Sequence, residues 1–138
     1  MTDHADLMTL RLAPQAHGVA LVRQAITGVG EALEMSPRLV SDIKLAVSEA
    51  CTNAILHGYS DPAASAKGTL TVVARTAPGA VVITVCDDGR GVTPRIDSQG
   101  LGLGLPLIAA LTTTMAIREA GSGGTEVEMT FGLHDDDA

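Results

Sequence analysis

The segment SEACTNAILHGY, residues 48–59, places three side chains that could do chemistry along one stretch of chain. Glu49 and Asn53 are four residues apart and His57 follows four later, so a helix would bring all three toward one side. A magnesium-assisted phosphoryl transfer could use such a set, because Asn offers a neutral oxygen to the ion and Glu polarises the attacking hydroxyl or water. The alternative is a solvated helix edge, with His57 a satisfied histidine at the helix end.

A second cluster follows an apolar run in the segment VVITVCDDGRGV, residues 81–92. Asp87 at the end of a buried strand is costly unless something pairs with it. The exocyclic amine of adenine is one suitable partner, since a carboxylate accepts its N–H, whereas guanine presents a carbonyl there and would be repelled. Gly89 and Gly91 would let the backbone pass close to a planar ligand. The alternative is a tight turn that uses Asp and Gly for turn chemistry.

A third cluster is the glycine-dense segment GLGLGLPLIAAL, residues 100–111. Gly100, Gly102 and Gly104 precede a predicted helix, where free N–H groups and the positive helix end would suit a phosphate. A dinucleotide-binding fingerprint does not fit, because Leu107 stands where its third glycine should be and no apolar strand leads directly into the loop. A Walker loop does not fit either, since Gly-Lys-Ser/Thr is missing. Alone, a glycine-rich loop is a weak signal.

Composition limits the kinds of protein that could carry these clusters. A chain of 138 residues forms one domain, and with no Trp, one Tyr and one Phe its core must be aliphatic. The net charge of −7 argues against nucleic acid as a partner, because phosphate contacts need a surplus of Lys and Arg. A nucleotide site remains open, since backbone amides and a bridging metal can bind phosphate.

Location and redox state follow from the same sequence. The opening MTDHADLMTL carries acids and no signal-like basic and apolar pattern. No apolar run approaches the roughly 18 residues that cross a bilayer, so we expect no membrane association and a cytoplasmic protein. Cys51 and Cys86 lie within apolar segments, which predicts buried, reduced thiols.

The elements that must position the clusters can be read from hydrophobic periodicity. The N-terminal part predicts a strand over 7–12, a helix over 14–35 and a second helix over 37–57. Ser36 and Pro37 are a typical N-cap and first helical residue, and Gly58 is well placed to end the second helix. On this helix Asp42, Glu49 and Asn53 share a shoulder beside the apolar face.

The rest of the chain predicts hairpins and one more helix. The expected elements are strands over 68–76 and 80–87 joined by APG, a helix over 105–115, and strands over 114–121 and 124–133 around GSGG. This order favours an α+β fold, a two-layer α/β sandwich in which helices cover one face of a mixed, mostly antiparallel sheet. We expect one domain over 1–132 and a disordered acidic tail over 133–138.

Together the three clusters resemble the N, G1 and G2 boxes of the GHKL superfamily of histidine-kinase-like ATPases, whose ATP-binding domain has the Bergerat fold. SEACTNAILHGY is similar to the N box, DDGRG to G1 and GLGLPLI to G2, with a late Gly-Thr in GGTEVEMTF. The resemblance covers about residues 10–132 and is strongest to the small anti-sigma-factor serine/threonine kinases of bacterial stress and sporulation control. The sequence contains no phosphoacceptor-histidine hairpin, so we do not expect a complete sensor histidine kinase.

The resemblance implies ATP and Mg²⁺ as cofactors and assigns roles by position. Asn53 would be the magnesium ligand, and Glu49 would be the catalytic base that aligns the acceptor hydroxyl. Asp87 would bind the adenine amine with Thr125 beside it. His57 is counted with the cofactor-binding residues.

The glycines take roles from the same resemblance. Gly89 and Gly91 would shape the adenine pocket, while Gly102, Leu103 and Gly104 would meet the phosphates through backbone N–H groups.

One departure from the family concerns the ATP lid between G1 and G2. Only VTPRIDSQ, residues 92–99, is available for it, with Arg90 and Arg95 as nearby candidates for the γ-phosphate. A short lid excludes water and orients phosphate less well.

The resemblance implies a protein serine/threonine kinase that phosphorylates an anti-sigma-factor antagonist, binds a sigma factor and could form a homodimer. The short lid keeps open a nucleotide-gated interaction module with little or no kinase activity. A third possibility is a domain that hydrolyses ATP without a protein acceptor.

Overall fold

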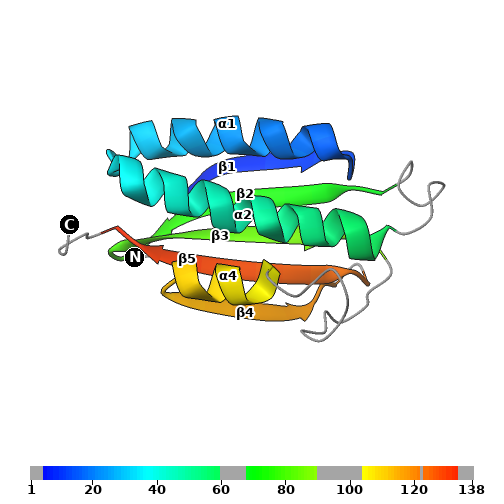
Figure 1. Cartoon of the computed structure of the whole chain (residues 1–138). Helices are drawn as coiled ribbons and strands as arrows, with labels where there is room; N and C mark the ends of the chain where they lie inside the picture. The colour runs from blue at the N-terminus through cyan, green and yellow to red at the C-terminus, as the bar shows by residue number, and fades with distance from the viewer. Residues whose placement is uncertain (1–4, 60–67, 90–103, 122, 134–138) are drawn as a thin grey trace.

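The fold is described by a computed structural model for residues 5–59, 68–89, 104–121 and 123–133. Its elements run in the order β1 (Ala5–Leu12), α1 (Ala16–Ala32), α2 (Pro37–Gly58), β2 (Leu70–Ala77), β3 (Ala80–Asp87), α4 (Gly104–Leu111), β4 (Thr114–Glu119) and β5 (Thr125–Gly132). The helices lie on one side of the sheet, and α2 crosses between α1 and α4 (Figure 1). The predicted α+β sandwich is confirmed.

The five strands form one sheet in the order β1-β2-β3-β5-β4. Every pairing among these described strands is antiparallel, so the mixed sheet expected from the sequence is antiparallel in this part of the chain. The register sets Leu70 opposite Asp87 and Cys86 opposite Glu126. The end of β3 therefore lies beside the start of β5, which is where the predicted site needs them.

The core forms between the helices and one face of the sheet. Alternate residues of β2, β3 and β5 are buried against α2, as the two-residue period of a strand requires. These are Leu70, Val72, Ala74, Val81, Ile83, Val85, Val127, Met129 and Phe131, which meet Ile43, Val47 and Ala50 of α2. The core is aliphatic apart from Phe131, as the composition predicted.

The other face of the sheet carries ion pairs rather than a helix. Arg75 lies 2.9 Å from Glu128 on β5, and Arg118 pairs with both Glu126 and Glu128. Exposed pairs of this kind contribute little to stability.

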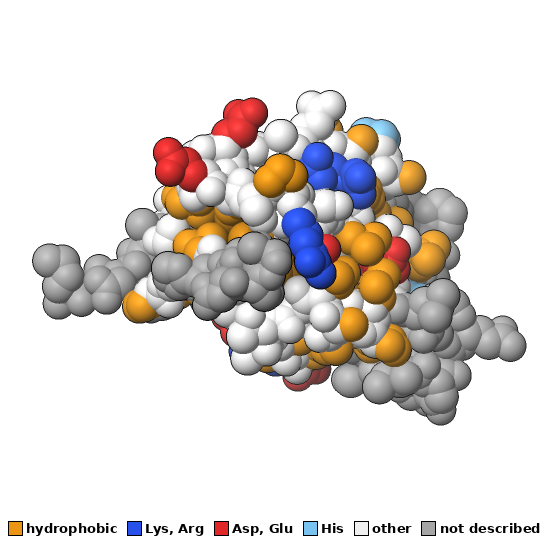
Figure 2. Space-filling model, turned by 60° about the vertical axis from the view of Figure 1, so that its left-hand side comes forward, with side chains coloured by type: hydrophobic (Ala, Val, Ile, Leu, Met, Phe, Trp, Pro, Cys, Tyr) orange, Lys and Arg blue, Asp and Glu red, His pale blue; other side chains and the backbone are white. Residues whose placement is uncertain are grey.

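Figure 2 shows one end of the molecule, where a few Lys and Arg side chains gather between hydrophobic ones. Among the described residues, none of the helices is long and apolar enough to cross a bilayer.

The helix boundaries follow local chemistry. The Ser36 side chain accepts the Leu39 N–H at 3.1 Å and caps α2, as predicted, and Gly58 is its last residue. The helix α1 is shorter than the predicted 14–35. It ends where Met35 N–H bonds to the Gly30 carbonyl, with Glu34 in the left-handed region at φ 55°.

The third predicted helix, over 105–115, is too long at its C-terminal end. The helix α4 stops at Leu111, and the Thr112 hydroxyl donates to the Ile108 carbonyl at 2.9 Å. The Thr113 N–H already donates to Thr130 of β5 at 2.7 Å, and Met115 lies in β4. A run of three β-branched threonines favours extended backbone, which explains why sheet pairing replaces the last predicted turn.

Candidate nucleotide site

The last two turns of α2 carry polar atoms that lack partners. Asn53 and His57 are half-buried, and their Nδ2 and Nε2 atoms are buried with no hydrogen-bond partner among the described residues. Buried polar groups are nearly always hydrogen-bonded, so two such atoms one turn apart need an explanation. Both side chains belong to residues that line one pocket, which makes a bound ligand a reasonable explanation.

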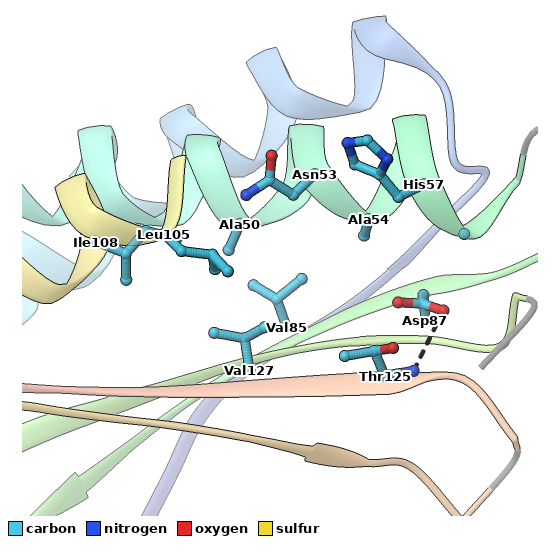
Figure 3. Close-up of a pocket in the computed structure, with 11 residues that line it drawn as sticks. Ala50, Asn53, Ala54, His57, Val85, Asp87, Leu105, Ile108, Thr125 and Val127 are labelled. Atoms are coloured by element: carbon cyan, nitrogen blue, oxygen red, sulfur yellow. Dashed lines mark hydrogen bonds between the residues drawn. The ribbon is translucent and has the colours of Figure 1, made fainter. Parts of the chain in front are cut away.

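Asp87 approaches the same pocket from the end of β3. Its side chain is almost fully buried, with 4% of its surface exposed. Oδ1 accepts the Gly89 N–H at 2.9 Å. It also accepts the Thr125 N–H at 3.4 Å, the hydrogen bond drawn in Figure 3. Burial raises the pKa of Asp87 above its ordinary value, and the two backbone donors offset this only in part. With Oδ1 engaged, Oδ2 is the oxygen available to a ligand N–H.

Glycines make room around Asp87. A Cβ at Gly124 would lie 1.9 Å from the Asp87 carbonyl oxygen, and one at Gly89 would lie 2.2 Å from the Gly58 carbonyl oxygen. Gly58 itself faces Asp87, since its Cβ would stand 3.2 Å from Oδ1. Three backbone segments therefore pass close to this carboxylate, and each uses a glycine to do so.

The N-terminus of α4 lies against Asn53. A Cβ at Gly104 would stand 2.6 Å from Asn53 Nδ2 and 3.0 Å from Oδ1. The first N–H groups of a helix have no partner within the helix, and anions bind there readily. The amide of Asn53 and the start of α4 could thus face the same phosphate group.

The pocket is narrow and largely apolar. Figure 3 shows side chains from α2, α4, β3 and β5 converging on it. The lining residues are Ala50, Asn53, Ala54, His57, Gly58, Val85, Asp87, Leu105, Ile108, Thr125 and Val127, around a cavity of about 30 Å³. That is room for one or two water molecules, so a purine ring requires the walls to separate.

The structure brings several of the predicted residues together. Asn53, His57, Asp87 and Thr125 all line the pocket. Gly89 supplies a backbone donor to Asp87.

Glu49 does not line the pocket. It is half-buried one turn before Asn53 on α2, and Asp42 is half-buried two turns before Glu49. Because Glu49 lies on the same helix but outside the pocket, its carboxylate could contact an acceptor hydroxyl that approaches from solvent.

Other predicted residues lie outside the described part of the chain. They are Gly91, Gly100, Gly102 and Leu103, the short lid segment 92–99, and Arg90 and Arg95. Of the tail predicted over 133–138, only Leu133 is described. Of the glycines predicted to meet the phosphates, Gly104 is described, and it lies beside Asn53.

Sequence reasoning missed the apolar wall of the pocket. Ala50 and Ala54 of α2 line the cavity, as do Val85 of β3 and Val127 of β5, and none of these four was predicted as a site residue. The available signal was the pair of small residues one turn apart, just before Asn53 and His57. Gly58 was assigned only to the helix end, although it also faces Asp87.

The two cysteines differ. Cys51 is fully buried, and burial raises its pKa to about 12, so the thiol is protonated and inert. Cys86 is only half-buried, since strand alternation turns it to the face of the sheet away from the helices. Both are free thiols, and the prediction of a buried thiol is right for Cys51 alone.

The pocket could hold a metal ion only if the nucleotide supplied most of the oxygen ligands and one residue supplied another. Among the described residues, no group of three or more His, Cys, Asp or Glu side chains is arranged to hold a metal ion. Mg²⁺ commonly takes only one or two protein ligands and completes its shell with phosphate oxygens and water. The Asn53 side chain beside the start of α4 could supply one such ligand through Oδ1, while Nδ2, which has no hydrogen-bond partner among the described residues, could donate to a phosphate oxygen.

Comparison with known proteins identifies the fold family. The histidine kinase-like ATPase domain matches residues 12–131, nearly the whole chain, so the protein belongs to that family. This is the class of protein that the resemblance of the three boxes implied. An ATPase domain implies ATP as the ligand of its pocket.

Individual relatives point to one branch of the family. The chain is 25% identical to an anti-sigma F factor of Thermoanaerobacter sp. (strain X514) over 139 residues, covering 93% of this chain and 94% of that protein. It is 30% identical over 102 residues to the serine-protein kinase RsbW of Bacillus velezensis, covering 74% of this chain and 62% of that protein.

Solved structures agree on the fold. The structure of the RsbU and RsbW domains of Rv1364c from Mycobacterium tuberculosis superposes with a TM-score of 0.69 at 26% identity. The match covers 92% of this chain but only 33% of that longer protein. A blue-light activated histidine kinase of Erythrobacter litoralis, at 22% identity and a TM-score of 0.62, shares the fold.

Proposed function

We propose that this protein is an ATP-dependent serine/threonine kinase of the anti-sigma-factor type. It phosphorylates a small antagonist protein and, in alternation, binds a sigma factor. One observation carries the proposal: polar atoms of Asn53 and His57 with no partner in the described part of the chain share a pocket with the buried carboxylate of Asp87 in a chain of the ATPase family. Its similarity to anti-sigma F factors and to RsbW supplies the acceptor class.

Recognition of the base rests on Asp87. Its Oδ1 is held by the N–H groups of Gly89 and Thr125, so Oδ2 is oriented to accept the exocyclic N–H of adenine. Ala54, Val85 and the other apolar lining side chains would contact the ring faces. Because the cavity is about 30 Å³, binding the base must widen the pocket.

The phosphate end rests on α2 and α4. The Asn53 amide oxygen would hold Mg²⁺, which would neutralise phosphate charge when bound. The first N–H groups of α4, beside Asn53, would contact the same phosphates, with Gly102 and Leu103 contributing as the resemblance implies. Gly91 would complete the base pocket in the same scheme.

Transfer requires a base outside the pocket, and Glu49 has that position. Its carboxylate accepts the proton of the acceptor serine or threonine as that oxygen forms a bond to the γ-phosphorus. The bond from the γ-phosphorus to the bridging oxygen breaks, and ADP leaves. Glu49 therefore acts on the protein acceptor, while Asn53 and Asp87 act on the nucleotide.

The proposal is tested with purified protein, Mg-ATP and an antagonist encoded beside this gene. Phosphate should appear on a serine or threonine of the antagonist, and Glu49→Ala should abolish transfer while leaving ATP affinity unchanged. Asp42→Ala is the matched control, because Asp42 lies on the same shoulder of α2, two turns away from Glu49. The Asp42→Ala protein should transfer phosphate normally. Transfer that persists in Glu49→Ala would remove Glu49 from the mechanism.

A second function is favoured by the short segment 92–99 between the G1 and G2 boxes. A nucleotide-gated interaction module would bind ATP and a partner without transferring phosphate. It is distinguished by tight ATP binding with no phosphoprotein in the presence of the neighbouring antagonist. Under either function we propose a single domain over 1–132 that works in the cytoplasm and could form a homodimer.

A further inference from the structure

Beside the pocket, one hydrogen-bonded cluster ties three segments of chain together. Tyr59, the residue after α2, is 7% exposed and its hydroxyl contacts the carboxylate Oδ1 of Asp88. The Asp88 N–H donates to the Tyr59 hydroxyl oxygen at 2.8 Å, and the Thr69 N–H donates to the same Asp88 Oδ1 at 2.9 Å. The hydroxyl also lies 3.1 Å from the Thr69 carbonyl oxygen. We call the Tyr59, Thr69 and Asp88 cluster the latch.

The latch joins the segments that surround the Asp87 carboxylate. Tyr59 follows Gly58, which faces Asp87, and Thr69 precedes Leu70, which pairs with Asp87 in the sheet. Asp88 is itself the next residue along the chain. The end of α2, the start of β2 and the end of β3 are therefore fixed to one another directly beside the pocket.

The geometry of Asp87 depends on the residue that the latch holds. Gly89 donates its N–H to Asp87 Oδ1, and it can do so because its backbone passes directly over the Gly58 carbonyl. Asp88 lies between Asp87 and Gly89, and its side chain is anchored to Tyr59 and Thr69. Freeing Asp88 would let Gly89 move, and Asp87 would lose one of its two backbone donors.

We propose that the Tyr59–Asp88 latch is a positioning device for Asp87, and that it sets both the affinity and the adenine selectivity of the nucleotide pocket. This inference rests on the proposed function, since it assumes that Asp87 reads the base. Neither latch side chain lines the pocket, so each acts through Asp87 and Gly89. The charges support the pairing: hydrogen bonds from Tyr59 and two backbone N–H groups outweigh the effect of burial and lower the pKa of Asp88.

The chain offers a direct probe of the latch, because Tyr59 is its single tyrosine and tryptophan is absent. In protein labelled at the tyrosine ζ-carbon, one NMR signal reports the hydroxyl environment without nucleotide. Asp88→Asn should shift this signal, since a neutral amide replaces the carboxylate that contacts the hydroxyl. An identical signal in wild type and Asp88→Asn would overturn the latch itself, whatever the protein binds.

Nucleotide titrations then test what the latch does. Tyr59→Phe and Asp88→Asn should each weaken Mg-ATP binding by about 2- to 10-fold, the value of one hydrogen bond, and the double variant should be no weaker than the worse single one. The preference for ATP over GTP should fall in the same variants. Val82→Ala is the matched control, because it removes a buried side chain on the far face of the sheet and should lower stability without altering either affinity.

The outcomes separate the two proposals. If wild type binds no ATP but the tyrosine signal shifts in Asp88→Asn, the latch exists and the proposed function fails. If wild type binds ATP and the latch variants keep wild-type affinity and selectivity, the positioning role is wrong and the proposed function stands. Equal losses in Val82→Ala would also overturn the positioning role, because they would show a general effect of stability.

Discussion

The two ends of α2 border two hollows of opposite character. At its N-terminal half an open groove of about 460 Å³ lies against α1, lined by Arg23, Glu31, Glu34, Lys44 and uncharged neighbours. At its C-terminal half the enclosed pocket measures about 30 Å³. Arg23 of the groove donates to Ser48 at 3.1 Å, whereas Asn53 and His57 of the pocket each retain a buried atom that no described residue hydrogen-bonds.

The comparison shows that room alone does not identify the site. The charged side chains of the groove reach solvent, so they incur no desolvation cost when the groove is empty. In the pocket, an unpartnered amide, an unpartnered imidazole nitrogen and a buried carboxylate each incur a desolvation cost that a ligand would offset. The helix α2 therefore has two jobs: its N-terminal half packs in the core, and its C-terminal half carries residues of the binding pocket.

The largest expected effect separates those two jobs. Ile43→Ala, at a fully buried position in the N-terminal half of α2, should lower the free energy of unfolding by about 2–5 kcal/mol. Asn53→Ala should change it by less than about 1 kcal/mol, because the Nδ2 that it removes has no partner within the described ranges of the chain. Urea unfolding followed by circular dichroism measures both. A large loss in Asn53→Ala would mean that this side chain holds the fold together.

A pair of glycine substitutions sharpens the contrast. In Gly30→Ala the new Cβ would lie 2.5 Å from Val40 Cγ2 where α1 crosses α2, so we expect a stability loss of about 1–3 kcal/mol, partly restored by adding Val40→Ala. In Gly104→Ala the Cβ would displace the Asn53 amide, so ATP affinity should fall about 10-fold or more. Thermal unfolding and calorimetric titration of both variants test this. An equal ATP affinity in Gly104→Ala and Gly30→Ala would contradict the expected contrast.

The pH dependence of stability tests the buried carboxylate. Because burial raises the pKa of Asp87, its contribution to stability is fully present below the unfolded value of about 3.9 and is lost as pH rises through the folded pKa. Asp87→Asn should therefore gain stability relative to wild type between about pH 4 and pH 7. It should also weaken ATP binding, since an amide N–H₂ replaces the acceptor. If the free energies of unfolding of wild type and Asp87→Asn change in parallel with pH, ionisation of Asp87 does not lower stability, and the prediction is wrong.

The smallest expected effect is a gain. Gly28 is exposed within α1, and a Cβ there would meet nothing within 4 Å. Gly28→Ala should raise the free energy of unfolding by about 0.5–1 kcal/mol, because Ala is the better helix former. Nucleotide affinity should not change. A loss of stability would show that the exposed side of α1 is constrained by something other than helix propensity.

Much of the fold follows from local patterns in the sequence. Ser36-Pro37 marks the start of α2, and strand alternation places Val81, Ile83 and Val85 in the core. Boundaries were harder where two structures compete. The threonines after Leu111 could extend a helix or begin a strand, and the partner that decides, Thr130, is distant in sequence.

The site was predictable as a set of residue types, and less so as a geometry. Asn53 and Asp87 could be selected because their chemistry and order match a known family. The latch could not, because a tyrosine after a helix and a second aspartate after a strand carry no signal until the sheet brings Thr69 between them. The narrowness of the pocket likewise depends on packing between four elements.

The central claim is that the polar atoms at the end of α2 and Asp87 form an ATP site. Calorimetric titration of the folded wild-type protein with Mg-ATP, beside Asn53→Ala at equal concentration, tests it most directly. We predict saturable one-site binding by wild type and a loss of about 100-fold in affinity for Asn53→Ala, as expected when a partner of charged groups is removed. Absence of binding by wild type, or the same affinity in both proteins, would contradict the claim.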